Sequence, residues 1–207
     1  MRTQPAAASR HAFSGGELKL DKNHGCSKTQ VGQLQTGAWD ALALGAFTSS
    51  EPNPQNARDV ALWKTYIGPD WPSQSKRIAD NFGQVVKFLG NKEFDIYLSC
   101  SDPSKLCHIE KDGKSIGGCA YEYKGWFGTY YYIAMSAPYF TMQSLDDKIQ
   151  EIERDLRNGD TKTATRSVWQ KNTGQAFLHE MMHLNVVGQP HINDETVEPD
   201  ATVMCQK

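Results

Sequence analysis

Apolar residues in the first half of the chain recur every three or four positions in three segments. The first spans residues 27–47, where Ser27 or Thr29 could cap a helix. Residues 54–66 and 73–90 repeat the spacing, and prolines or glycines separate the segments. The pattern predicts a helical N-terminal half.

The pattern then changes to one that is typical of strands. Residues 94–100 alternate weakly between apolar and polar side chains, and residues 130–135 are aromatic or β-branched. Between them, residues 107–123 contain Asp112-Gly113, a strong signal for a hairpin turn. These segments predict a small mixed sheet.

Helical spacing returns towards the C-terminus. Residues 144–158 begin at Ser144, a possible cap, and residues 173–187 form the last helical segment. Helices, then a small sheet, then helices predict an α+β fold. We expect residues 1–25, which are mostly small or polar, to form a flexible tail, and residues 26–207 to form one domain.

Composition narrows the possible partners. The 207 residues are 39% hydrophobic and 22% charged, which is typical of a globular protein and excludes a wholly disordered chain. The net charge of -2 argues against a nucleic-acid partner. No run of 18 apolar residues could form a membrane-spanning helix, and we expect no membrane partner.

The last helical segment contains the sequence H-E-x-x-H. His179 and His183 are four residues apart, so a helix places both imidazoles on one face, where they can bind one Zn²⁺. Glu180 adjoins the first histidine and could act as the general base for a water molecule that the ion activates. The motif therefore indicates a zinc-dependent hydrolase that cleaves peptide bonds.

A catalytic zinc ion usually has a third protein ligand. Gly188 and Pro190 are expected to end the helix and turn the chain. Three candidate ligands follow that turn: His191, Asp194 and Glu195. Spacing alone does not choose among them.

Most of the chain from Cys26 onward resembles the deuterolysin-like aspzincins, fungal zinc endopeptidases that include lysine-specific enzymes. H-E-x-x-H is the most specific part of the resemblance. The other matching segments are W-K-T-Y-I-G at 63–68, I-A-D-N-F-G-Q-V-V-K-F at 78–88, I-Y-L-S-C at 96–100, Cys107, C-A-Y at 119–121 and A-P-Y-F at 137–140.

The resemblance implies a zincin-like metalloprotease domain with one catalytic Zn²⁺. It also implies a secreted endopeptidase that acts on proteins or peptides, and we expect a monomer. In that family the third ligand is an aspartate in the loop after the helix, which corresponds to Asp194. His191 remains the alternative ligand, or a donor to the oxyanion.

The loop departs from the family in one respect. Aspzincins commonly have G-T-x-D-x-x-Y-G, whose tyrosine is thought to stabilise the oxyanion. Val197 stands three residues after Asp194, and no Tyr-Gly follows before Lys207. An alternative hypothesis is therefore a catalytically impaired zincin-fold protein that keeps its zinc and acts as a secreted binding or effector protein.

Residues 130–136 are the predicted edge strand beside the zinc site. An extended substrate can pair with such a strand through main-chain hydrogen bonds. Tyr131 and Ile133 are the candidate substrate-contacting residues, and Ala137-Pro138 would end the strand.

The five cysteines contain no C-x-x-C pair, which argues against a structural zinc knuckle. By analogy with aspzincins that have two disulfides, the expected pairs are Cys26–Cys100 and Cys107–Cys119, with Cys205 left over. Disulfides favour secretion. No signal peptide is visible, so we expect a precursor that has been trimmed.

Overall fold

The computed structural model describes residues 18–22, 24–90, 96–101, 110–111, 114–115, 117–165 and 170–192. Within these residues the chain forms six α-helices and a small four-stranded mixed sheet. The fold is therefore mixed α+β, as the order of the sequence patterns predicts. None of the described helices combines the length and apolar character needed to cross a bilayer.

The helices begin where the sequence offers caps. Helix α1 spans Lys28–Thr48, and the Ser27 hydroxyl accepts the Gln30 N–H while the Gln30 side chain accepts the Ser27 N–H. Ser144 caps α4 by accepting the Asp147 N–H. The remaining helices are α2 (Ala57–Tyr66), α3 (Trp71–Gly90), α4 (Leu145–Arg157), α5 (Lys162–Thr165) and α6 (Thr173–Met182), with a 3₁₀ turn η1 at Tyr139–Thr141.

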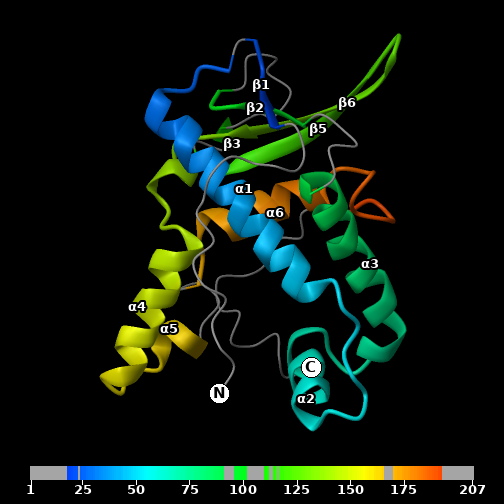
Figure 1. The fold of residues 1–207 in the computed structure, drawn as a ribbon, viewed down its shortest axis with the longest axis vertical. Helices are drawn as coiled ribbons and strands as arrows, with labels where there is room; N and C mark the ends of the chain where they lie inside the picture. Colours follow the sequence, from blue (N-terminus) through cyan, green and yellow to red (C-terminus); the bar gives the residue numbers. More distant parts are fainter. Residues whose placement is uncertain are drawn as a thin grey trace.

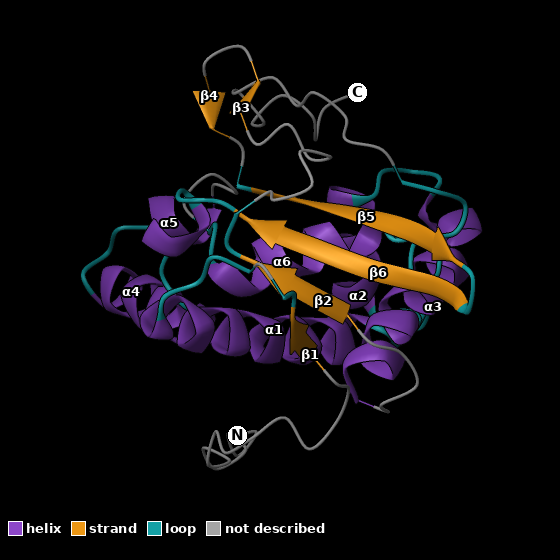
Figure 2. Cartoon of the chain, turned by 90° about the horizontal axis from the view of Figure 1, so that it is seen from above, coloured by secondary structure: helices purple, strands orange, loops and turns teal. Residues whose placement is uncertain are grey.

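The sheet has the strand order β1-β2-β6-β5 (Figure 2). Its strands are β1 (Leu18–Leu20), β2 (Ile96–Ser99), β5 (Gly118–Gly125) and β6 (Gly128–Met135). Strands β1, β2 and β6 run parallel, whereas β5 is antiparallel to β6. Short strands β3 (Glu110–Lys111) and β4 (Lys114–Ser115) pair on either side of the predicted hairpin turn.

The hydrophobic core lies between the sheet and three helices. Helices α1, α3 and α6 lie together below the sheet in Figure 1, and α1 packs against both of the others. Ile96, Leu98 and Ile133 point from the sheet into this core and are almost completely buried. Because these side chains alternate with outward-facing ones, a single register buries one face of the sheet.

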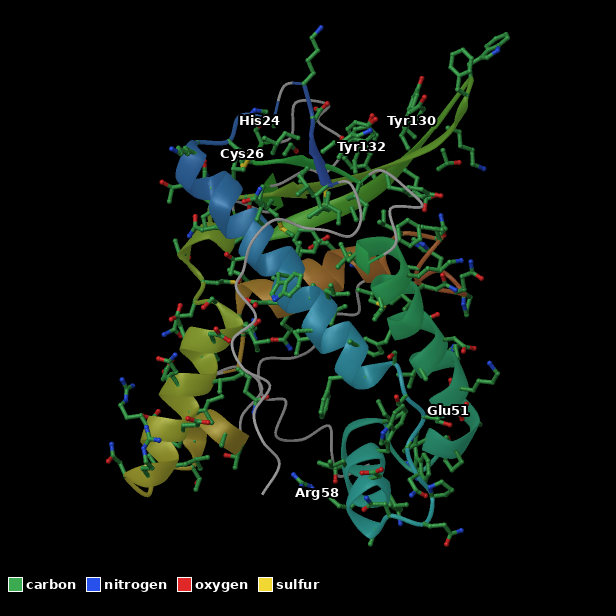
Figure 3. The ribbon with its side chains drawn as sticks, viewed as in Figure 1. His24, Cys26, Glu51, Arg58, Tyr130 and Tyr132 are labelled. Atoms are coloured by element: carbon green, nitrogen blue, oxygen red, sulfur yellow. A yellow bond between two sulfur atoms is a disulfide. The ribbon has the colours of Figure 1, made fainter. Side chains whose placement is uncertain are left out.

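The opposite face of the sheet carries tyrosines. The Tyr132 ring is stacked between Tyr97 and Tyr121, with ring centroids 5.2 and 4.9 Å away. Figure 3 shows Tyr130 and Tyr132 on the side of the sheet that faces away from α1. The tyrosines at 130 and 132 therefore lie on the outer face, while Tyr131 faces the core.

The prediction of a flexible tail over residues 1–25 is wrong for Leu18–Leu20. Leu18–Leu20 form β1, which pairs in parallel with β2, and the Asp21 N–H donates to the Leu98 carbonyl at 2.9 Å. A three-residue strand carries too little alternation to be recognised in a sequence, and only its pairing partner reveals it. The rest of the predicted tail lies mostly outside the described residues.

A disulfide joins Cys26 to Cys100, as expected. It connects the start of α1 to the end of β2, and it closes a loop with a sequence separation of 74. Cys119 is also disulfide-bonded. Its partner lies outside the described residues, as do both Cys107 and Cys205.

Candidate metal centre

The H-E-x-x-H sequence spans the C-terminal end of α6: His179 and Glu180 belong to its last turn, and His183 is the C-cap residue that follows it. The Asn172 side chain caps this helix by accepting the Gln175 N–H, and Phe177 and Met181 are completely buried against the core. His179 is exposed and His183 is half-buried. The helix is therefore anchored by one face while both histidines remain within reach of solvent.

The two imidazoles converge on one point. The Nε2 atoms of His179 and His183 lie 3.1 Å apart, with the ring planes at 87°. Two nitrogens that bind one tetrahedral zinc ion at 2.0–2.1 Å lie about 3.3 Å apart. The pair therefore fits two ligands of a single ion.

The backbone orients the His183 ring. Its Nδ1 lies 2.7 Å from the Ile192 carbonyl oxygen, which can only accept a hydrogen bond. The proton of the neutral ring must therefore be on Nδ1, and the Nε2 lone pair faces His179. A hydrogen bond of this kind is the usual way in which a protein sets the tautomer of a metal-binding histidine.

Glu180 is buried between the helix and the sheet, with 6% of its surface exposed. Its Oε1 atom would lie 3.2 Å from a Cβ added at Gly118, the first residue of β5. That Cβ would also lie 2.7 Å from the Met135 sulfur. The glycine at position 118 therefore leaves space for the Glu180 carboxylate. The sequence pattern did not predict this role for Gly118.

The structure does not identify a third ligand for the predicted metal site. The described residues contain no group of three or more His, Cys, Asp or Glu side chains that could hold a metal ion, so His191 is not gathered with the pair. Asp194 and Glu195 lie outside the described residues.

Helix α6 ends at Met182, five residues earlier than the predicted end at residue 187. In a longer helix the Asn185 N–H would donate to the Met181 carbonyl. It donates instead to Glu122 Oε1 at 2.6 Å, and the Asn185 side-chain amide donates to Glu122 Oε2 at 3.2 Å. The carboxylate on β5 therefore ties the turn that follows the helix to the sheet.

The prediction that residues 130–136 form an edge strand is wrong. Strand β6 lies between β2 and β5, so β5 forms this edge of the described sheet. Tyr131 is 8% exposed and packs edge-on against Phe88 of α3, and Ile133 is completely buried. Burial and the Glu122 carboxylate raise the pKa of Tyr131. Neither Tyr131 nor Ile133 can meet a substrate, because each fills the core beneath the sheet.

Comparison with known proteins does not assign the chain to a family. No protein-family description, curated protein or solved structure matches the chain significantly. The functional interpretation therefore rests on the residues and geometry of this chain.

Proposed function

We propose that the protein is a zinc-dependent metalloendopeptidase with a zincin-like fold. The observation that carries this proposal is the convergence of the His179 and His183 Nε2 atoms, which lie 3.1 Å apart. The residue next to His179 in the sequence, Glu180, is buried. The Nδ1 hydrogen bond of His183 to the Ile192 carbonyl supports it, since that bond directs the Nε2 lone pair towards the site.

We take Asp194 as the third ligand. Ile192 is held against the His183 ring, and two further residues can extend at most about 7 Å along the chain. Asp194 is therefore within reach of the histidine pair. A donor set of two imidazoles and one carboxylate suits zinc and leaves a fourth position for water.

Each residue then has a defined role. When bound by His179, His183 and Asp194, zinc would lower the pKa of a water molecule and polarise the scissile carbonyl. Glu180 would take a proton from that water and pass it to the leaving amine. Burial of Glu180 supports this role, because a carboxyl group held away from bulk water keeps one orientation towards the site.

Strand β5 is the proposed substrate-binding strand. It is the edge strand of the sheet, it contacts α6, and its first residue lies beside Glu180. An extended peptide could pair with this edge of the described sheet through main-chain hydrogen bonds, whatever the peptide's side chains. This places a protein or peptide substrate across the candidate metal centre.

The test combines metal analysis with hydrolysis of casein by the full chain. We expect one zinc ion per chain, loss of zinc in His179→Ala and His183→Ala, and loss of hydrolysis with zinc retained in Glu180→Gln. Glu153→Gln, on the exposed side of α4, is the matched control and should retain both. A chain that binds no zinc would refute the proposal.

A second candidate is a zincin-fold protein that keeps its zinc and acts as a secreted binding or effector protein. The absence of Tyr-Gly after Asp194 favours it, because an expected oxyanion donor is then missing. Zinc-loaded wild-type protein that does not hydrolyse casein or unfolded peptides would select this candidate. The Cys26–Cys100 disulfide is compatible with secretion in either case.

A further inference from the structure

The hairpin formed by β5 and β6 extends beyond the rest of the sheet. Strand β2 pairs with β6 only over Tyr131–Ala134, so the outer pairs Tyr123–Tyr130, Lys124–Thr129 and Gly125–Gly128 form a two-stranded arm. This arm projects at the upper right of Figure 1, away from the helices. The end of the hairpin is therefore free to contact a separate surface.

Two large aromatic side chains occupy the tip of this arm. Trp126 and Phe127 form the turn between Gly125 and Gly128, and they are 97% and 92% exposed. Tyr123, at the base of the tip, is also exposed. Two adjacent aromatic side chains that are this exposed form an apolar patch, and such patches are often functional.

We propose that this tip, residues 123–130, docks the protein on the surface of a lipid bilayer. Tryptophan and tyrosine favour the membrane–water interface, where the ring meets the acyl chains and its polar group stays hydrated. Lys124 is exposed, and residues 123–132 contain no Asp or Glu. This charge pattern suits anionic headgroups.

The size of the tip favours a bilayer over a protein partner. Two aromatic side chains can bury at most about 500 Å² of surface. A stable protein interface buries about 800 Å² on each side with a complementary shape. A bilayer needs no complementary shape and accepts a small apolar tip.

The arrangement would also leave the candidate metal centre in water. Seven residue steps along β5 separate Gly118 from Gly125, and a strand rises about 3.3 Å per residue. The tip is therefore about 23 Å along the strand from Glu180. The inference goes beyond the proposed function, and it departs from the expectation that the protein has no membrane partner.

The test is co-sedimentation of the full chain with phosphatidylcholine vesicles, with and without phosphatidylserine. We expect wild-type binding that phosphatidylserine strengthens, and a loss of at least about tenfold in the double variant Trp126→Ser/Phe127→Ser. Phe47→Ser is the matched control, because Phe47 is 85% exposed on α1 and should bind like wild type. Lys124→Gln should weaken only the phosphatidylserine-dependent part.

Fluorescence supplies a readout that does not depend on sedimentation. Trp126 emission should shift to shorter wavelength on vesicles and be quenched by brominated lipid, and Trp126→Phe should remove that response. Absence of vesicle binding by wild type, or equal loss in Phe47→Ser, would overturn the proposal. So would self-association that the double variant abolishes, because the tip would then join two copies of the chain.

Discussion

Glu122 on the edge strand β5 accepts two hydrogen bonds from Asn185, one from its backbone N–H at 2.6 Å and one from its side-chain amide at 3.2 Å. Asn185 is only two residues beyond His183, so this contact joins the strand to the turn that follows the histidine pair. The edge strand and the candidate metal ligands are therefore held in one arrangement.

Replacing Glu122 by alanine should loosen that arrangement. We expect a loss of about 1–2 kcal/mol of stability, since both Asn185 donors lose a charged acceptor. Hydrolysis should fall about tenfold while zinc is retained, because the strand is no longer held in place against α6. Thermal unfolding, zinc content and casein hydrolysis measure the three effects. Glu122→Gln, which keeps one acceptor oxygen, should be milder, and equal effects of the two variants would contradict this explanation.

Gly118→Ala should impair the proposed catalysis by displacing Glu180. The new Cβ would lie 3.2 Å from Glu180 Oε1 and 2.7 Å from the Met135 sulfur, so the carboxylate or the strand must shift. We expect kcat to fall by about tenfold to a hundredfold, with zinc content unchanged. Gly117→Ala is the matched control, since its Cβ would approach only the Met142 methyl group, at 3.8 Å. A similar loss of kcat in both variants would argue against a role for the space at Gly118.

The proposed third zinc ligand can be tested by comparing two substitutions. Mutation of a residue that only hydrogen-bonds to a metal ligand typically weakens metal affinity by about 10–100-fold. Asp194→Asn should weaken zinc binding by more than that, because it removes a ligand. His191→Ala should leave the zinc affinity nearly unchanged, because the structure does not gather His191 with the histidine pair. Competition with a chromogenic chelator measures both affinities. The opposite ranking would make His191 the ligand.

Two glycines of α1 should respond in opposite directions to alanine. A Cβ at Gly37 would overlap the hydroxyl of the buried Tyr139, whereas a Cβ at Gly32 would meet nothing within 4 Å. Gly37→Ala should therefore lower the free energy of unfolding by about 1–3 kcal/mol. Gly32→Ala should raise it by about 0.5–1 kcal/mol, because alanine favours a helix interior. Urea unfolding of the pair tests this, and a destabilised Gly32→Ala would contradict it.

The Lys148–Glu151 pair on α4 should make stability depend on pH. Lys148 Nζ donates to Glu151 Oε2 at 2.7 Å, and this hydrogen bond lowers the pKa of the Glu151 carboxyl below its ordinary value. A carboxyl whose pKa is depressed by folding stabilises the protein above its unfolded pKa, about 4.3, and loses that contribution as the pH falls through the folded pKa.

Glu151→Gln should therefore lower the melting temperature at neutral pH, and the difference from wild type should shrink in acid. Differential scanning calorimetry across that range measures it. Glu153→Gln, whose carboxylate lies 3.9 Å from Arg157, controls for the loss of one acidic charge. A difference that stayed constant with pH would show that the Glu151 effect is not due to titration.

Local patterns predicted much of the fold. The spacing of apolar residues located α1, α3 and α4, and the caps at Ser27 and Ser144 are those expected. These features depend only on residues within one or two helical turns of each other. They can therefore be predicted from a short stretch of sequence. The turn after α6 was not predictable in this way, because the Asn185 N–H in that turn donates to Glu122, which is 63 positions away in the sequence.

By itself the sequence determined that His179 and His183 share one face of a helix, since positions four apart do so in any α-helix. Only the tertiary structure decided which strand forms the sheet edge, that β1 joins the sheet, and that Gly118 makes room for Glu180. Strand order and close packing arise from contacts between segments far apart in the chain. Such contacts leave no periodic pattern in the local sequence. The geometry of one helical turn, in contrast, depends only on residues a few positions apart.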